Sequence, residues 1–227
     1  MKNLFLLFYN FFEDHIHLPR IKKFLNNNVI LDRPIIIDIG SHKGKFIKLF
    51  NDLYKNATIF CFEPNNTLNK NLKDLEKNIK IFNFALGDKL EKKKLYFNNL
   101  DLTSTFKDYN KSSLYYKFKQ IILRKKNKDE YKDVQVTTLD YFCEEHKISK
   151  IELLKIDVEG NEYSVLKGGS QILENVKFLI IEIQNNELYK DYSKNIIEDF
   201  LEKKNFQLIQ IYKFPFMFFE DRIYKKR

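Results

Sequence analysis

The sequence has only two cysteines, Cys61 and Cys143, and no apolar run near the roughly 20 residues that cross a bilayer. Two cysteines exclude a disulfide framework and a cysteine-rich zinc site. Both lie in apolar surroundings, which is typical of a reducing compartment, so we expect a cytoplasmic protein. Residues 1–12 are apolar and aromatic but too short for a signal peptide, and they predict a docking helix.

Arginine is also scarce. The 227 residues include 40 Lys and Arg against 31 Asp and Glu, a formal net charge of +9, but only five of the basic residues are Arg. Nucleic-acid binders usually rely on arginine for bidentate phosphate and base contacts. Lys, Asn and Ile are all abundant, and AT-rich codons encode all three, so we attribute the charge mainly to composition. An anionic partner, such as a phosphorylated substrate, a membrane surface or nucleic acid, is the alternative.

The chain length suits one globular domain with a modest insertion. We expect an N-terminal helical segment over residues 1–33 and a main α/β domain over residues 34–227. Residues 99–132 interrupt the pattern, and we interpret them as an insertion over the site because they are too few to bury a core of their own. There is no internal repeat and no low-complexity linker.

Short apolar, β-branched runs alternate with helical stretches along the main domain. Strands are expected at Pro34–Ile39, Thr58–Phe62, Ile79–Ala85, Lys93–Phe97, Val134–Thr138, Ile151–Val158 and Lys177–Ile183, and a C-terminal hairpin at Phe206–Lys213 and Phe216–Tyr224. Helices are expected at Lys45–Tyr54, Asn65–Lys77, Ser112–Lys126, Leu139–Lys147, Glu162–Leu173 and Tyr192–Lys204. This alternation predicts an open, mostly parallel sheet with helices on both faces and an antiparallel strand from the hairpin. Ligands bind at the carboxyl ends of such strands.

A glycine-containing turn follows the first expected strand. It reads Asp38-Ile39-Gly40-Ser41-His42-Lys43-Gly44. The turn lacks the G-x-G-x-x-G pattern of dinucleotide folds and the Gly-Lys-Ser/Thr ending of a P-loop. The acid two residues before Gly40 suits a cationic or hydroxyl-bearing ligand, and an ordinary strand-to-helix turn is the alternative.

Acids also end the next two strands. Glu63 lies 25 residues after Asp38 and could accept hydrogen bonds from both hydroxyls of a ribose. The alternative is an exposed strand-end Glu before the terminating Pro64. In the turn Leu86-Gly87-Asp88, the Asp88 carboxylate could accept from an adenine amino group, and a plain Gly-Asp turn is the alternative.

The fourth candidate is an acidic cluster beside a lysine. Lys155, Asp157 and Glu159 alternate at the end of a buried strand, and Glu182 closes the next one. Burying such groups is expensive unless they are paired or serve a site. A structural Lys–Asp pair is the alternative reading.

These segments resemble the FkbM-type family of S-adenosylmethionine-dependent methyltransferases. The matching pieces are IIIDIGSHKGKF, FCFEPN, NFALGD, STF, VQVTTLDYF, IELLKIDVEGNEYSVLKGG and FLIIEIQ, in the family order between about Ile35 and Gln184. The resemblance implies a class I methyltransferase (Rossmann-like) fold, a seven-stranded, mostly parallel sheet with an antiparallel C-terminal hairpin strand. It also implies S-adenosylmethionine as cofactor and O-methylation of hydroxyls, mostly on sugars and polyketide-like products.

The resemblance assigns roles to the strand-end residues. The residues expected to bind the cofactor are Asp38, Gly40, Ser41, His42, Gly44, Glu63, Pro64, Leu86, Gly87 and Asp88. His42 departs from the family, which more often has Asn there. The Tyr- and Lys-rich insertion is not explained by the family pattern.

A base must remove the proton of the attacking hydroxyl. Asp157 is our first candidate and Glu159 the second, with Lys155 orienting either carboxylate. A divalent cation held by Asp157, Glu159 and Glu182 is the alternative. We place Glu182 on the acceptor side of the site.

Residues of the insertion are candidates for binding the acceptor. Ser104 and Thr105 are expected in a substrate-side loop, and Tyr115 and Tyr116 as aromatics that stack on a sugar, with a simple helix-packing face as the alternative.

The expected acceptor contains a sugar that could be phosphorylated or lipid-linked, with peripheral membrane contact allowed. One rival is a catalytically inactive nucleoside-binding protein of the same fold, which the intact acids argue against. Another is a nucleic-acid methyltransferase, but the Asn/Asp-Pro-Pro-Tyr-type motif is absent and no specific nucleic acid is expected.

Overall fold

The computed structural model describes residues 2–65, 78–97, 104–123, 130–185, 187–215 and 219–227. Seven strands form the main sheet in the order β10-β11-β9-β8-β1-β2-β3. They are β1 (Ile35–Ile39), β2 (Thr58–Phe62), β3 (Ile79–Phe82), β8 (Ile151–Ile156), β9 (Val176–Gln184), β10 (Phe206–Lys213) and β11 (Phe219–Lys226). In this sheet β11 runs opposite to the other six strands, and every pairing that does not involve β11 is parallel. The predicted fold class, a mostly parallel α/β sheet with an antiparallel strand from the C-terminal hairpin, is confirmed.

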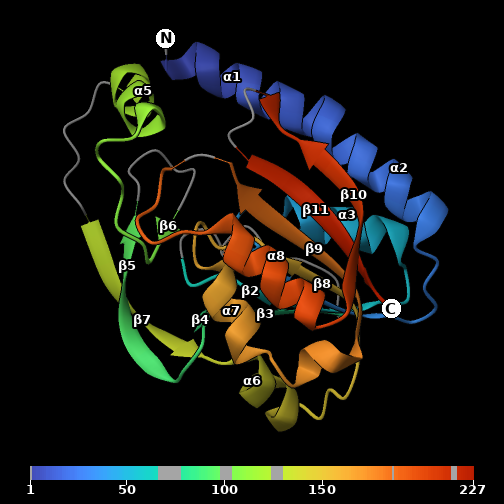
Figure 1. Ribbon diagram of the computed structural model, residues 1–227. Helices are drawn as coiled ribbons and strands as arrows, with labels where there is room; N and C mark the ends of the chain where they lie inside the picture. Colours follow the sequence, from blue (N-terminus) through green and yellow to red (C-terminus); the bar gives the residue numbers. More distant parts are fainter. Residues whose placement is uncertain (1, 66–77, 98–103, 124–129, 186, 216–218) are drawn as a thin grey trace.

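Helices cover both faces of this sheet (Figure 1). They are α1 (Lys2–Phe12), a π-helical turn (Glu13–His17), α2 (Leu18–Asn28), α3 (Lys45–Leu53), α6 (Leu139–Glu145), α7 (Glu162–Gly168), a 3₁₀ turn (Ile172–Asn175) and α8 (Lys194–Lys203). Buried residues of α2 and α3 pack with Ile36 and Ile59 in one core layer. Those of α6, α7 and α8 pack with Ile37 and Ile39 in the other. Alternate residues of the central strands therefore face opposite layers, as a strand buried on both faces requires.

A second sheet of four strands, with the order β4-β7-β5-β6, lies beside the first. Its strands are β4 (Ala85–Leu86), β7 (Glu130–Thr137), β5 (Glu91–Phe97) and β6 (Ser104–Thr105), and α5 (Leu114–Leu123) follows β6. The sequence predicts a single strand over Ile79–Ala85, and this is wrong: β3 ends at Phe82. Ala85 instead pairs with Val136 in the second sheet.

One predicted helix differs from the structure, and another falls outside the described residues. The helix expected over Glu162–Leu173 stops at Gly168, where a side chain would meet the carbonyl oxygen of Gly87 at 1.9 Å, and a 3₁₀ turn follows. The helix expected over Asn65–Lys77 lies almost wholly outside the described residues. Among those that the structure describes, no helix combines the length and apolarity needed to span a membrane. The division into a segment over 1–33 and a main domain stays a prediction.

Candidate active site

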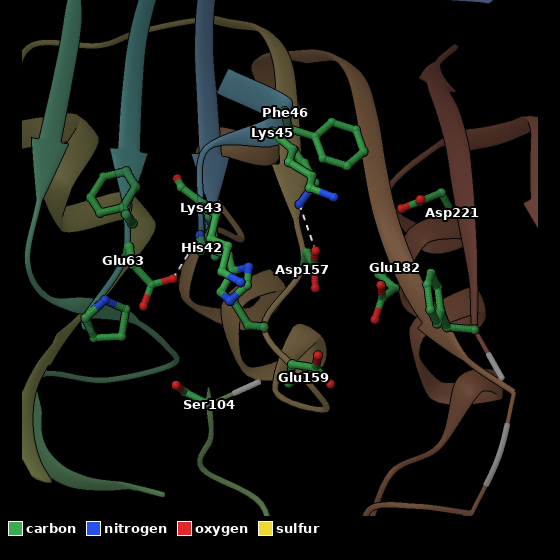
Figure 2. Close-up of a pocket in the computed structure, with 18 of the residues that line it drawn as sticks. His42, Lys43, Lys45, Phe46, Glu63, Ser104, Asp157, Glu159, Glu182 and Asp221 are labelled. Carbon is green, nitrogen blue, oxygen red and sulfur yellow. Dashed lines mark hydrogen bonds and ion pairs between the residues drawn. The ribbon is translucent and has the colours of Figure 1, made fainter. Parts of the chain in front are cut away.

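A pocket opens where the carboxyl ends of β1, β2 and β8 meet (Figure 2). One side is lined by the turn after β1, by the end of β2 and by β4, namely Gly40, Ser41, His42, Lys43, Glu63, Pro64, Ala85 and Leu86. Asp157, Val158 and Glu159, which follow β8, line it as well. The structure thus brings together most of the strand-end residues that the sequence singled out.

The turn after β1 lies directly against the segment after β8. Gly40 has φ +83°, and a Cβ atom there would lie 1.7 Å from the carbonyl oxygen of Asp157. The backbone N–H of Asp157 in turn donates to the carbonyl of Ile39 at 2.9 Å. Only glycine allows this approach, so the turn is fixed close to the acids. Gly44 (φ +77°) begins α3 and does not line the pocket.

Glu63 is a buried carboxylate on the pocket wall. Its two oxygens accept hydrogen bonds from the backbone N–H groups of His42, at 3.0 Å, and Asn65, at 2.8 Å. Burial raises the pKa of Glu63 to about 7, although these two donors oppose the rise. Each carboxylate oxygen has a further lone pair. Glu63 can therefore accept hydrogen bonds from two ligand hydroxyls.

Asp38 and Lys155 are register partners in β1 and β8 and are both buried. The Lys155 ammonium lies 3.0 Å from an oxygen of Asp157 and 3.7 Å from one of Asp38. Burial acts to lower the pKa of Lys155, but the carboxylates of Asp157 and Asp38 outweigh it and raise the pKa well above its usual value. Burial raises the pKa of Asp38, which does not line the pocket. Asp38 thus lies behind the pocket wall, and its predicted role in cofactor binding stays a prediction.

Three carboxylates converge at the centre of the pocket. Asp157, Glu159 and Glu182 point into the same space (Figure 2), and their nearest oxygens all lie within 4.8 Å of one another. The Tyr189 hydroxyl donates to Glu159 at 2.5 Å, and the Gln184 amide donates to Glu182 at 2.6 Å. Burial and the neighbouring acids raise the pKa of Glu182 well above its usual value. Such a cluster favours a cationic or hydroxyl-donating ligand, and the cation alternative stays a prediction.

Residues from both ends of the chain also line the pocket, and sequence reasoning missed them. They are Tyr9, Asn10, Glu13 and His17 from the N-terminal helices and Phe219 and Asp221 from β11. Glu13 pairs with Lys45 at 2.7 Å, which ties the N-terminal helices to α3. The only sequence signal was the change from an apolar helix to the polar residues that start at Glu13.

Asp88 lies outside the main pocket, which differs from the cofactor-binding position that the sequence predicts. Its carboxylate accepts from the Ser164 hydroxyl and the Lys167 ammonium, both at 2.8 Å, and these bonds lower its pKa to about 2. Asp88 lines a separate surface pocket with these two residues. The carboxylate therefore ties α7 to the turn after β4, and the adenine contact expected of it is not supported. Gly87 does not line the main pocket either.

Of the four insertion residues predicted to bind the acceptor, only one lines the pocket. Ser104 lines the pocket, whereas Thr105 is buried and donates to the carbonyl of Glu159 at 2.7 Å, so it supports the acidic segment from behind. Neither Tyr115 nor Tyr116 lines the pocket, and Tyr116 packs on the ring of Tyr109. For Tyr116 the helix-packing alternative fits the structure better than sugar stacking, and the assignment of Tyr115 stays a prediction.

The chain matches one family model, and the two similar proteins described here are both methyltransferases. Residues 38–208 match the family described as the methyltransferase FkbM domain. The 2-O-methyltransferase NoeI of Sinorhizobium fredii is 28% identical over 169 residues, which cover 69% of this chain and 66% of NoeI. The hexuronic acid methyltransferase AglP of Haloferax volcanii is 39% identical over 59 residues, or 26% of this chain and 25% of AglP.

Solved structures share the fold. A methyltransferase FkbM from Methylobacillus flagellatus aligns with a TM-score of 0.55 and 13% identity, over 87% of this chain and 45% of that one. An rRNA methylase from Streptococcus thermophilus aligns with a TM-score of 0.52 and 13% identity, over 92% and 96%. The chain thus spans just under two thirds of NoeI and less than half of the Methylobacillus protein, and at these identities the structures establish the fold alone.

Proposed function

The chain belongs to the FkbM methyltransferase family and is an S-adenosylmethionine-dependent enzyme, and from that premise we propose that it methylates a hydroxyl group of a sugar, glycan or glycolipid. The observation that carries the proposal is the pocket at the ends of β1, β2 and β8. It has a hydroxyl-accepting carboxylate, Glu63, on one wall and the acids after β8 on the other. The names of NoeI and AglP, a 2-O-methyltransferase and a hexuronic acid methyltransferase, support a sugar as acceptor.

The residues of the pocket fit the cofactor. Glu63 is held by two backbone N–H groups in a position to accept from ribose hydroxyls. Gly40 lines the pocket, and its lack of a Cβ atom lets the turn lie against the carbonyl oxygen of Asp157. When bound, S-adenosylmethionine supplies a methyl group on a positively charged sulfur. The excess of carboxylates on the pocket wall suits that charge.

We assign Asp157 as the general base. A sugar hydroxyl is a poor nucleophile until its proton leaves, and a positioned base contributes about 10²–10⁴-fold in rate. The carboxylate of Asp157 faces the pocket, and the buried Lys155 ammonium holds it by a 3.0 Å hydrogen bond. Glu159, held by Tyr189, is the second candidate. The fixed positions of these side chains would also orient the hydroxyl for attack.

Transfer of a radiolabelled methyl group from the cofactor to a bacterial glycan extract tests the proposal, with RNA and DNA fractions assayed beside it. We expect label in the glycan fraction, and its loss in Asp157→Asn while cofactor affinity is kept. Asp133→Asn, an exposed acid on β7, is the matched control. Label in nucleic acid would favour a nucleic-acid methyltransferase. Cofactor binding without transfer to any fraction would favour an inactive nucleoside-binding protein.

A further inference from the structure

The π-helical turn between α1 and α2 faces the pocket. In this turn the N–H of Leu18 donates to the carbonyl of Glu13, five residues earlier. Such turns interrupt α-helices mostly at functional sites. The first and last residues of the turn, Glu13 and His17, both line the pocket, whereas His15 between them is exposed. The turn lies outside the matched residues 38–208, so nothing in the family match assigns it a role.

His17 has one ring nitrogen paired and one unpaired. Its Nε2 lies 2.7 Å from a carboxylate oxygen of Asp221, and both side chains are buried. A carboxylate accepts hydrogen bonds, so Nε2 donates to Asp221 and Nδ1 is the ring nitrogen left for another partner. Nδ1 is buried and finds no hydrogen-bond partner within the described ranges. Leaving a buried polar atom without a partner destabilises the protein, and a ligand hydroxyl would supply the missing hydrogen bond.

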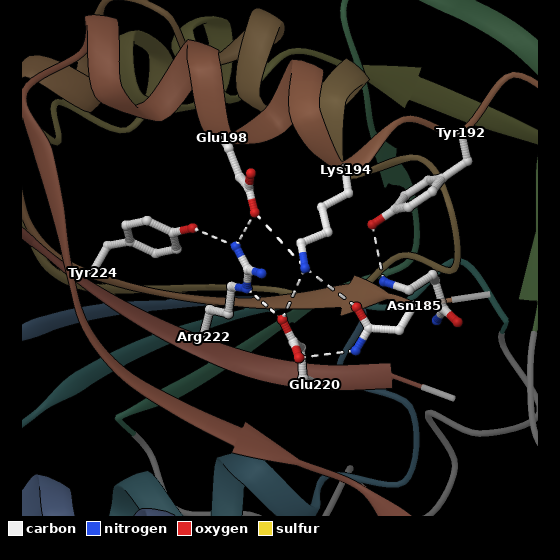
Figure 3. Close-up of polar contacts among 8 residues, drawn as sticks. Asn185, Tyr192, Lys194, Glu198, Glu220, Arg222 and Tyr224 are labelled. Carbon is white, nitrogen blue, oxygen red and sulfur yellow. Dashed lines mark hydrogen bonds and ion pairs between the residues drawn. The ribbon is translucent and has the colours of Figure 1, made fainter. Parts of the chain in front are cut away.

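Asp221 is itself held in place from the other side of the sheet. Its neighbours on β11, Glu220 and Arg222, face α8, where Arg222 pairs with Glu220 at 2.6 Å and also contacts Glu198 (Figure 3). Because side chains alternate along a strand, Asp221 faces the opposite layer and meets His17. The rings of Phe214 and Phe219 enclose the imidazole. The orientation of His17 is therefore fixed before any ligand binds.

We propose that His17, oriented by Asp221, binds the acceptor: its Nδ1 makes a hydrogen bond with a hydroxyl of the sugar ring. This inference rests on the proposed function and names the acceptor half of the same pocket. The wall of this subsite comes from the N-terminal helices and β11, with Tyr9, Asn10 and Glu13 beside His17. His17 is a binding residue here, and Asp221 is a positioning residue that acts through it.

The subsite also defines the class of ring that it takes. Its carboxylates, those of Glu13, Glu182 and Asp221, accept hydrogen bonds from hydroxyls. The two buried or half-buried cations on the wall are already paired, Lys45 with Glu13 and Asp14, and Lys155 with Asp157 and Asp38. The third lysine that lines the pocket, Lys43, is exposed. Among the described residues, a carboxylate or phosphate inside the pocket would therefore face these acids with no buried, unpaired cation beside it. The ring that enters the pocket is thus uncharged and rich in hydroxyls, and it is neither a uronic acid nor a sugar phosphate.

A matched pair of sugars tests the class of ring. Methyl glucoside and methyl glucuronide, and the corresponding galactose pair, differ only in a CH₂OH against a carboxylate. With S-adenosylhomocysteine present, we expect the neutral sugars to bind at least about tenfold more tightly. Equal or tighter binding of the uronides would overturn this inference and leave the proposed function intact. If no sugar of either kind binds or is methylated while the cofactor binds, the proposed function fails.

Two variants test His17 in the whole chain. For His17→Gln we expect KM for the neutral sugar to rise about tenfold or more, with kcat less affected and cofactor affinity unchanged. His15→Gln, two residues away on the exposed face, is the matched control and should change neither constant. Asp221→Asn should raise KM in the same direction, and it serves if His17→Gln fails to fold. A fall in kcat alone, or no change in KM, would overturn the assignment. If both variants lose cofactor binding, the preference of the unaltered chain for the neutral sugars over the matching uronides still tests the proposed class of ring.

Discussion

The Lys155 ammonium nitrogen lies 3.0 Å from a carboxylate oxygen of Asp157, at the point where β8 ends beside β1. On its other side lies the buried Asp38, 3.7 Å away. One buried cation thus serves two acids, one below the pocket and one on its wall. This arrangement links the stability of the central strands to the position of the proposed base.

We expect Lys155→Met to lower the free energy of unfolding by about 3–5 kcal/mol, because it leaves the buried Asp38 without a counter-charge. Urea denaturation followed by circular dichroism measures the change. Lys150→Met is the control: Lys150 is largely exposed and pairs with Glu152 at 2.8 Å. A surface pair of this kind contributes less than about 1 kcal/mol. Equal effects of the two substitutions would contradict the role given to Lys155.

Cofactor affinity should depend on the protonation of Glu63. Burial raises its pKa to about 7, so near pH 6 the side chain is mostly protonated and loses acceptor capacity toward the ribose hydroxyls. Above pH 8 it is ionised and accepts from both. We therefore expect affinity to rise with pH between 6 and 8, by up to about tenfold for one linked proton.

Calorimetric titration with the cofactor across this pH range measures the effect. Glu63→Gln should bind more weakly at pH 8 and show a flat profile. Glu187→Gln, at an exposed position, is the control and should keep the wild-type profile. A wild-type profile in Glu63→Gln would exclude Glu63 as the titrating group.

Glu162 should make the fold less stable at alkaline pH. It is fully buried, and burial raises its pKa to about 8, although the N–H of Gly160 donates to it. Because the folded pKa lies above the unfolded one, the stability that the protonated form contributes is complete below about pH 4.5. It is lost as the pH rises to about 8. Glu162→Gln keeps an acceptor for Gly160 and has no charge to bury.

We expect Glu162→Gln to gain stability relative to the wild type between pH 5 and 9, by about 2 kcal/mol or more. Thermal and urea unfolding at each pH measure the difference. A constant difference across the range would show that the pKa of Glu162 is not raised in the folded protein.

Gly40→Ala should damage both the fold and the cofactor site. A Cβ atom would overlap the carbonyl oxygen of Asp157 at 1.7 Å, and φ is +83°. Strain and overlap together predict a loss of about 3 kcal/mol or more, with cofactor binding reduced in whatever remains folded. Gly169→Ala is the control, since φ there is −110° and the nearest atom is the flexible end of Leu139 at 2.9 Å. Comparable losses in the two variants would contradict this account of the turn.

The strand ends were predictable from sequence because short β-branched runs stop at acids and glycines. Asp38 lies near the end of β1, and Glu63 and Asp157 directly follow β2 and β8. The topology of a parallel sheet brings such strand ends to one edge. Asp88 was misplaced because its turn leads into a second sheet, where β4 has two residues and pairs with a strand more than 40 residues away. No local pattern encodes a pairing that short and that distant.

The acceptor wall was not predictable for a related reason. His15 and His17 are two residues apart and so lie on different faces of a helix, but this spacing does not show that one face meets β11. The contact between His17 and Asp221 joins residues 204 apart in the chain. The amino-acid composition of the π-helical turn that starts at Glu13 does not distinguish it from an α-helical turn. These features follow from how the two ends of the chain pack together, which one sequence does not show.

The acidic cluster can act as a base or hold a divalent cation, and chelation separates the two. Asp157 is hydrogen-bonded to Lys155, Glu159 to Tyr189 and Glu182 to Gln184. Each carboxylate thus already has a protein partner, and the Lys155 ammonium supplies positive charge beside Asp157. If Asp157 is the base, EDTA treatment and desalting leave it in place. We therefore expect the rate of methyl transfer after this treatment to stay within about twofold of the untreated rate, because the contribution of the base to the rate is kept. A loss of activity that Mg²⁺ or Mn²⁺ restores, with cofactor affinity unchanged throughout, would replace the base by a cation that acidifies the hydroxyl.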